Sequence, residues 1–167
     1  MIKYLKKGST IDIFIVLIIF FLDRISKILV ISYSKKSFSA DLFSSKFLNI
    51  SLIWNEGIAF GLFSFEESRL YDFLTIFIFI VVIVIFFMIL KNDGMKKFSL
   101  LMIFGGAIGN IYDRIFFKAV PDFIDIHIGN FHWFIFNVSD IFISLGVLFL
   151  IYLELMDNQK DEVNEKN

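Results

Sequence analysis

Four long apolar runs, separated by polar segments, set the pattern of this chain of 167 residues. The runs cover residues 11–31, 73–90, 98–117 and 131–153. Each is close to the roughly 20 residues that an α-helix needs to cross the hydrocarbon core of a membrane. Charges interrupt the first run at Asp12, Asp23, Arg24 and Lys27, whereas the second run has none. The pattern predicts an all-α integral membrane protein with four transmembrane helices.

A polar section, residues 32–72, lies between the first two runs. Its segment 47–54 mixes apolar and polar positions among β-forming residues, which favours a short strand. Gly57 and Gly61 indicate tight turns just after that segment. We therefore expect a small β-containing cap on the membrane surface, within a single domain of residues 1–156. Residues 157–167 are expected to form a polar, frayed tail.

The lysines predict which side of the membrane each end occupies. They cluster before the first run, at Lys3, Lys6 and Lys7, and between the second and third runs, at Lys91, Lys96 and Lys97. By the positive-inside rule, both clusters and both termini are expected in the cytoplasm. The cap and the connection 119–130 are then extracytoplasmic, although Lys35, Lys36 and Lys46 in the cap weaken this signal.

Composition supports a membrane protein and removes several chemistries. Hydrophobic residues make up 57% of the chain and mean hydropathy is +0.77, above the content of ordinary globular domains. The net charge of −1 gives no sign of a nucleic-acid partner. The absence of cysteine excludes disulfides and thiolate chemistry. The basic start followed by an apolar run also fits a cleaved signal peptide, but no small-x-small cleavage site follows it.

The predicted topology brings the polar residues of three helices to one depth. The first and third helices would run outward and the fourth inward, so their polar positions converge near the outer face. Asp23 and Lys27 have i, i+4 spacing and can pair, or can serve as interfacial anchors. Arg114 is either a ligand for a carboxylate, carbonyl or phosphate, or a headgroup anchor. Gly105 and Gly109 form a small-xxx-small pattern, which predicts close helix packing.

Two carboxylates flank the connection between the third and fourth runs. Asp122 follows the third run and Asp140 lies within the fourth. Helices joined by a short connection are usually antiparallel neighbours, which can bring these carboxylates together. Two close carboxylates do not both ionise easily, so one can hold a proton while the other accepts one from water. The alternative is two unrelated helix-end carboxylates.

Two alternative hypotheses for the polar residues remain to be considered. His127 and His132 could join Asp122 and Asp125 around a metal ion, but their spacing matches no HExxH pattern, and we expect no metal site. A small membrane transporter or proton-relay protein would also use buried ionisable groups. A relay is expected to spread such groups across the membrane, whereas here they gather on one side.

Five motifs in this chain resemble those of the lipoprotein signal peptidases, also called signal peptidase II. They are DRISK (23–27), NEGIAFG (55–61), GNIYDR (109–114), VPDFID (120–125) and FNVSD (136–140), in the family's order. The resemblance covers most of the chain, from the first apolar run to the fourth. It implies a four-helix membrane aspartic endopeptidase that removes the signal peptide from diacylglyceryl-modified prolipoproteins, cutting before the lipidated cysteine.

The resemblance also implies roles for particular residues. The family's catalytic aspartates match Asp122 and Asp140. Its substrate-binding and supporting positions match Asp23, Lys27, Asn55, Gly57, Gly109, Asn110, Arg114 and Asn137. The chain departs from the family at Pro121, where a β-branched residue is usual, and at Ser139, where alanine is usual.

The same resemblance implies the setting in which the chain works. The expected location is the bacterial cytoplasmic membrane, with the active site near its outer face. The expected partners are prolipoprotein substrates and membrane lipids. We also expect the protein to act as a monomer and to need no cofactor.

Overall fold

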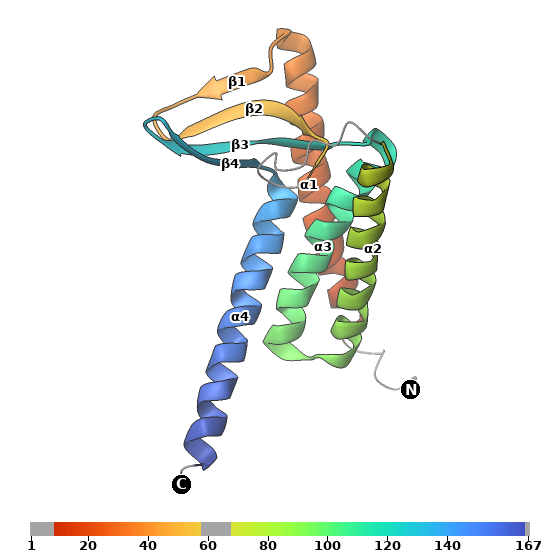
Figure 1. The fold of residues 1–167 in the computed structure, drawn as a ribbon, viewed down its shortest axis with the longest axis vertical. Helices are drawn as coiled ribbons and strands as arrows, with labels where there is room; N and C mark the ends of the chain where they lie inside the picture. The colour runs from red at the N-terminus through yellow and green to blue at the C-terminus, as the bar shows by residue number, and fades with distance from the viewer. Residues whose placement is uncertain (1–8, 58–67, 166–167) are drawn as a thin grey trace.

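Four helices run alongside one another, and a small sheet lies across one end of them (Figure 1). The structure is a computed structural model that describes residues 9–57 and 68–165. The helices are α1 (Ser9–Ser37), α2 (Ser68–Lys91), α3 (Gly94–Phe117) and α4 (Val138–Glu165). The strands are β1 (Asp41–Ser44), β2 (Leu48–Asn55), β3 (Val120–Ile128) and β4 (Phe131–Phe136). Lys3, Lys6, Lys7 and Gly61, which entered the sequence predictions, lie outside the described residues.

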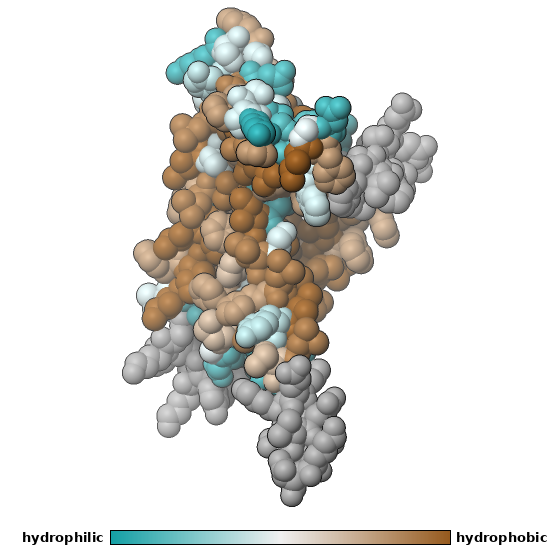
Figure 2. Space-filling model, turned by 90° about the vertical axis from the view of Figure 1, so that its left-hand side faces the viewer, coloured by the Kyte–Doolittle hydropathy of each residue, from teal (hydrophilic) through white to brown (hydrophobic). Residues whose placement is uncertain are grey.

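Three helices of the described chain are long and apolar enough to cross a membrane: Tyr71–Lys91, Gly94–Phe117 and Val138–Asp157. Their outward side chains are apolar, as expected where hydrocarbon replaces water around the protein. Figure 2 shows hydrophobic residues over the middle of the molecule and hydrophilic residues near its two ends, on the face in view. A mostly helical membrane protein with a small antiparallel sheet is therefore confirmed.

Helix α1 differs from the other three because it carries charges in its apolar middle. Phe14, Phe21 and Ile25 on its outer side are more than half exposed. Asp23 and Lys27 point inward and are 0% and 1% exposed. At about 1.5 Å per residue, its 29 residues extend about 43 Å, which exceeds the hydrocarbon thickness.

Helix α3 lies at the centre of the bundle and packs against α1, α2 and α4. Its glycines allow the closest approaches. A Cβ on Gly105 would lie 3.1 Å from Ile19 of α1, and one on Gly106 would lie 2.5 Å from the Ser139 carbonyl oxygen of α4. The close packing predicted from the small residues is therefore confirmed.

The sheet is antiparallel, in the order β1-β2-β3-β4, and joins two distant parts of the chain. Its central pairing matches Asn55 with Val120 and Ile53 with Asp122. Gly129, with φ of 59°, provides the left-handed backbone of the turn between β3 and β4. The cap thus includes residues 120–136 as well as the 41–55 segment, which places Asn55 next to Asp122.

Three predicted boundaries are wrong. Residues 131–136 form strand β4, and the fourth helix begins only at Val138. The aromatic, β-forming residues of β4 pair with β3, and this pairing overrides their continuity with the apolar helix that follows. Helix α1 continues to Ser37, into the section assigned to the cap, and α4 continues to Glu165, through the section assigned to a frayed tail.

Candidate active site

The β3–β4 hairpin carries Asp122 on its first strand and delivers the chain to the start of α4, which carries Asp140. Both aspartates line one cavity at the junction of the sheet and the helices. Asp122 is 4% exposed, and Asp140 is half-buried. The cavity is lined by Asn55, Asn110, Arg114, Val120, Asp122, Phe134, Ile135, Asn137, Asp140, Ile143 and Ser144. The two carboxylates therefore lie at one cavity, as predicted. The β3–β4 hairpin, and not a short helix–helix connection, brings them there.

Asn137 links the two aspartates. Its Nδ2 donates to Asp122 Oδ1 at 2.6 Å, while its Oδ1 accepts from the Asp140 amide at 3.1 Å. The Asn137 amide in turn donates to Asp140 Oδ2 at 3.0 Å. This reciprocal pair is a capping box, with Asn137 at the N-cap of α4 and Asp140 three residues later. Asp140 is therefore fixed in place by the same bonds that begin the helix.

Each carboxylate has a second amide partner. Asn55 Nδ2 donates to Asp122 Oδ2 at 2.8 Å, and Asn110 Nδ2 donates to Asp140 Oδ1 at 2.8 Å. Burial, followed by the neighbouring Asp140 carboxylate, raises the pKa of Asp122 from its ordinary 3.8 to about 6. Asp122 can therefore hold a proton at a pH at which an ordinary aspartate is ionised.

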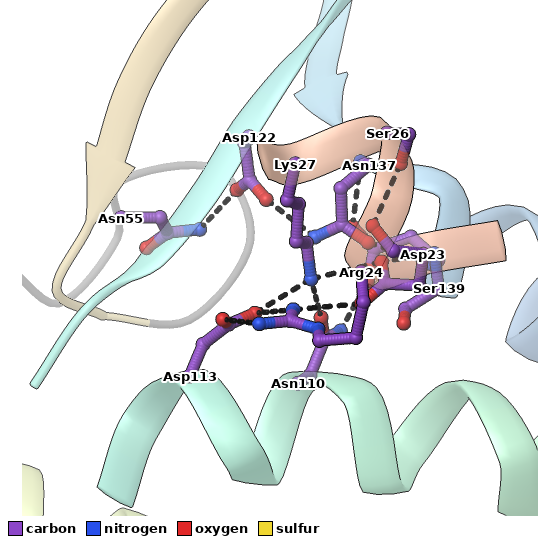
Figure 3. A network of polar contacts seen from close by, with 11 residues as sticks. Asp23, Arg24, Ser26, Lys27, Asn55, Asn110, Asp113, Asp122, Asn137 and Ser139 are labelled. Carbon is purple, nitrogen blue, oxygen red and sulfur yellow. Dashed lines mark hydrogen bonds and ion pairs between the residues drawn. The ribbon is translucent and has the colours of Figure 1, made fainter. Parts of the chain in front are cut away.

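A cluster of four buried charges lies directly behind this pair (Figure 3). The predicted pairing of Lys27 with Asp23 is confirmed, with Nζ 2.9 Å from Oδ1. Lys27 also contacts Asp113 Oδ2 at 2.7 Å, and Arg24 contacts both Asp113 and Asp23. Breaking one partner of such a buried pair typically costs roughly 3–5 kcal/mol. Sequence reasoning did not assign a role to Arg24 or Asp113.

Arg114 holds the turn that follows β2. Its Nη2 donates to the Gly57 carbonyl at 3.2 Å, and the Gly57 amide donates to Asn55 Oδ1 at 2.9 Å. Arg114 is 8% exposed and lines the cavity, yet its Nε and Nη1 have no hydrogen-bond partner among residues 9–57 and 68–165. Buried donors of this kind normally have a partner, so an acceptor beyond the described residues is expected at this position.

Four residues of the predicted site do not line the cavity. Asp23 and Lys27 lie in the buried charge cluster, and Gly57 supports Asn55. Gly109 lies at the helix crossing, where a Cβ would collide with Ser139 Oγ and Asp23. Conversely, the cavity includes Ser144, which the sequence reasoning missed. Helical spacing could have predicted it, because Ser144 lies one helical turn after Asp140 on the same face of the helix.

The two departures from the family motifs fit the structure without displacing the aspartates. Pro121 pairs with Trp54 of β2, and β4 joins β3 only from Ile124 onward. The missing N–H of Pro121 is therefore tolerated much as on an edge strand. The backbone amide of Ser139 donates to Asp23 Oδ1 at 3.1 Å, whereas its buried hydroxyl has no hydrogen-bond partner among the described residues.

Asp125 and the histidines lie apart from Asp122. Since strand residues alternate between faces, Asp125 points to the opposite side of β3 from Asp122. It accepts from Asn49 at 3.0 Å and contacts His132 Nδ1 at 2.8 Å, and His132 stacks on His127. Burial opposes ionisation, but these bonds outweigh it and lower the pKa of Asp125. Among the described residues, no group of three or more histidine and carboxylate side chains is arranged to hold a metal ion.

The sequence is similar to those of known proteins over most of its length. A family model described as signal peptidase (SPase) II matches residues 15–156. The chain is 48% identical to the lipoprotein signal peptidase of Pelagibacter ubique (strain HTCC1062), over 96% of each chain. It is 38% identical to that of Anaplasma phagocytophilum (strain HZ), over 89% of this chain and 94% of the relative.

Two solved structures of bacterial membrane enzymes have a similar fold. A bacterial membrane enzyme determined by the in meso method at 1.9 Å resolution superposes with a TM-score of 0.77 at 26% identity, covering 91% of this chain and 96% of that one. A second, at 2.3 Å resolution, gives a TM-score of 0.70 at 28% identity, covering 93% and 92%.

The membrane fold and the paired carboxylates beside a cavity define a membrane-embedded aspartic peptidase. The match over residues 15–156 makes the assignment specific, and the chain belongs to the signal peptidase II family. Family membership also decides against the transporter or proton-relay alternative.

Proposed function

We propose that Asp122 and Asp140 are the catalytic dyad of this peptidase. The observation that supports this most directly is Asn137, which is bonded to both carboxylates at the wall of the cavity. In the singly protonated dyad, the ionised carboxylate accepts a proton from a water molecule that attacks the scissile carbonyl. The protonated carboxyl then donates its proton to the departing amide nitrogen. Water thus adds across one peptide bond, and the dyad returns to its singly protonated form.

The reaction is the removal of signal peptides from prolipoproteins, as family membership indicates. In finer detail, we propose that the substrate carries a diacylglyceryl group and is cut just before the modified cysteine. Apolar side chains of the cavity wall, Phe134, Ile135 and Ile143, suit the substrate's apolar portion. The direct test is a gel-shift assay of a purified diacylglyceryl prolipoprotein incubated with this protein.

Substrate binding divides into two groups of residues in this proposal. Asn55, Asn110, Arg114 and Asn137 line the cavity and would hold the substrate backbone. Asp23, Lys27, Gly57 and Gly109 would support that surface from behind. The enzyme is proposed to act as a monomer among membrane lipids, in one domain formed by residues 1–156, without a metal or an organic cofactor.

Helix α1 is proposed as a fourth span, because its central charges are neutralised internally. Two cations and two carboxylates pair within the bundle, so no net charge faces hydrocarbon. The start of α1 and the end of α4 lie at the end of the molecule away from the sheet (Figure 1). By the positive-inside rule, the lysines near that end support a cytoplasmic location for both termini and an active site near the outer face.

Reporter fusions test this topology. A fusion near Ser45 is expected to report the outer side, and one near Asn92 the cytoplasmic side, because β1 and the α2–α3 turn lie at opposite ends of the bundle. Paired phosphatase and fluorescent-protein reporters would measure this. Finding both positions on one side would reject the four-span arrangement.

The Arg114→Ala variant is expected to lose most of its cleavage activity, roughly tenfold or more. Arg114 anchors Gly57 and has two donors at the cavity without a partner in the described part of the chain, and hydrogen bonds to a charged group contribute about 1.5–3 kcal/mol. Lys46→Ala is the control, because Lys46 is exposed in the cap and its ammonium contacts only the Phe47 ring among the interactions described. Equal activity of both variants, at equal expression, would leave Arg114 as a headgroup anchor.

A further inference from the structure

The charge cluster behind the dyad is neutral as a whole. It contains two carboxylates, Asp23 and Asp113, and two cations, Arg24 and Lys27. Three of the four side chains are at most 1% exposed, and Arg24 is 11% exposed. A charge buried at this depth is stable only while its partners remain in place. Removing one cation therefore leaves an uncompensated negative charge close to the catalytic carboxylates.

Lys27 donates two hydrogen bonds within the protein, to Asp113 and Asn110, and also forms an ion pair with Asp23. Its ammonium contacts Asp23 Oδ1 at 2.9 Å, Asp113 Oδ2 at 2.7 Å and Asn110 Oδ1 at 3.0 Å. The position of Lys27 is thus set by two carboxylates on different helices.

The contact with Asn110 determines which way that amide points. Because Lys27 can only donate, the Asn110 oxygen must face it. The Asn110 nitrogen then faces Asp140, and donates to its Oδ1 at 2.8 Å. Lys27 therefore transmits the arrangement of the charge cluster to a carboxylate of the proposed dyad.

Arg24 fixes the two carboxylates that hold Lys27. Its Nη1 donates to Asp113 Oδ1 at 2.5 Å, and its Nη2 donates to Asp113 Oδ2 at 2.6 Å and to Asp23 Oδ2 at 2.8 Å. The guanidinium also lies 4.8 Å from the Tyr112 ring centroid. A planar, bidentate contact of this kind gives a defined geometry that a lysine does not reproduce.

We propose that Arg24, which does not line the cavity, is a positioning residue for the catalytic dyad. It clamps Asp23 and Asp113, and these hold Lys27 beside Asn110 (Figure 3). Lys27 in turn orients Asn110, which donates to Asp140. It also supplies the positive charge that balances the second carboxylate. This inference rests on the proposed function, since it takes Asp140 as catalytic.

The effect of an Arg24 substitution on the pH dependence of cleavage depends on the other charged groups near the dyad. They are Asp23, Arg24 and Lys27 from α1, and Asp113 and Arg114 from α3; β2 contributes the neutral Asn55. Loss of one positive charge from this set favours the protonated forms of both dyad carboxylates. The pH–rate profile should therefore move to higher pH.

The test is the Arg24→Gln variant of the full chain in detergent micelles, assayed on a diacylglyceryl prolipoprotein. We expect kcat to fall roughly 10- to 100-fold, as for a small misplacement of reacting groups, with little change in KM and a profile shifted to higher pH. Arg24→Lys keeps the charge and loses the bidentate contact. The Arg24→Lys variant should have the pH–rate profile of the unmodified protein but should recover only part of the lost kcat.

Lys97→Gln is the matched control. Lys97 of α3 pairs with Asp12 of α1 at 2.6 Å, so this variant also removes a cation from a bond between the same two helices, at the end far from the dyad. Its kcat and pH profile should equal those of the unmodified protein. If Arg24→Gln behaves like Lys97→Gln, Arg24 is structural only and the inference is overturned.

A double variant keeps the test decisive if Arg24→Gln does not fold. Arg24→Gln with Asp113→Asn removes one charge of each sign and leaves the Asp23–Lys27 pair. We expect this variant to fold and to have a low kcat, because Lys27 has lost one of its two carboxylates. Full activity would reject the positioning role. Failure of the proposed function is distinguishable, since cleavage would then survive Asp140→Asn in the same assay.

Discussion

The Asp122→Asn and Asp140→Asn variants are each expected to lose cleavage by roughly 10²- to 10⁴-fold, the usual contribution of general acid–base catalysis. Asparagine keeps the size of the side chain but can neither carry the negative charge nor exchange the proton. Because the two carboxylates act as a unit, the double variant should be scarcely slower than either single variant. Prolipoprotein cleavage by purified, folded protein is the measurement, and independent, additive losses would contradict a shared dyad.

The pH dependence follows from the raised pKa of Asp122. Burial and the Asp140 carboxylate keep its proton up to a pH of about 6. The rate should therefore fall above about pH 6, as that proton leaves, and again at low pH, as both carboxyls become protonated. The resulting bell-shaped profile belongs to the coupled pair rather than to one residue.

The same pKa makes a prediction about stability. A carboxyl whose pKa is higher in the folded state favours folding below its unfolded pKa, and this contribution is lost as pH rises through the folded pKa. A rise in the pKa of Asp122 from 3.8 to about 6 corresponds to roughly 3 kcal/mol of folding free energy. Asparagine cannot accept from both Asn55 and Asn137, so the Asp122→Asn variant loses one hydrogen bond at every pH. Its stability relative to the unmodified protein should nevertheless rise by up to roughly 3 kcal/mol between pH 4 and pH 7.

Asp125→Asn is the internal control for these variants. It is also an aspartate of β3, but it points to the opposite face and contacts Asn49 and His132. Its cleavage rate should stay near that of the unmodified protein. A chelator should also leave the rate unchanged, and loss of activity on chelation would revive the metal alternative at His127 and His132.

Local spacing was enough to predict several contacts of the site. The i, i+4 spacing of Asp23 and Lys27 predicted an ion pair, and the two glycines of α3 predicted close packing. Both are properties of a single helix, in which neighbours three and four residues apart share a face. The convergence of polar residues at one depth likewise followed from helix directions alone.

The contacts between distant segments could not be predicted in this way. Asp113 is 89 residues from Arg24 in the chain, and its partner is chosen by helix packing. Asn55 contacts Asp122 because β2 pairs with β3. No local sequence pattern predicted this pairing. Residues 131–136 were assigned to a helix because a run of apolar residues fits either element. Their pairing with β3 decides in favour of the strand.

The Gly106→Ala variant is expected to lose both stability and activity. A Cβ at Gly106 would lie 2.5 Å from the Ser139 carbonyl oxygen and 2.9 Å from Ile143 Cγ1. The first of these atoms is backbone, so α4 itself must move away from α3. Overpacking of this kind costs about 1–3 kcal/mol. The moved residue precedes Asp140, so the shift reaches the dyad directly, and we expect a lower kcat as well as a lower Tm in detergent.

Gly105→Ala is the matched control, one residue away on the same helix. The three atoms nearest to its Cβ would all belong to Ile19 of α1, at 3.1–3.3 Å, so a movement of a few tenths of an ångström relieves the contact, far less than the 2.5 Å approach to a backbone oxygen at Gly106 requires. Alanine also favours the helix by up to about 1 kcal/mol relative to glycine, which offsets this contact. Thermal unfolding and cleavage should therefore stay close to those of the unmodified protein. If the two variants lose equal stability and equal activity, the α3–α4 contact at Ser139 does not position Asp140, and the link between helix packing and the dyad fails.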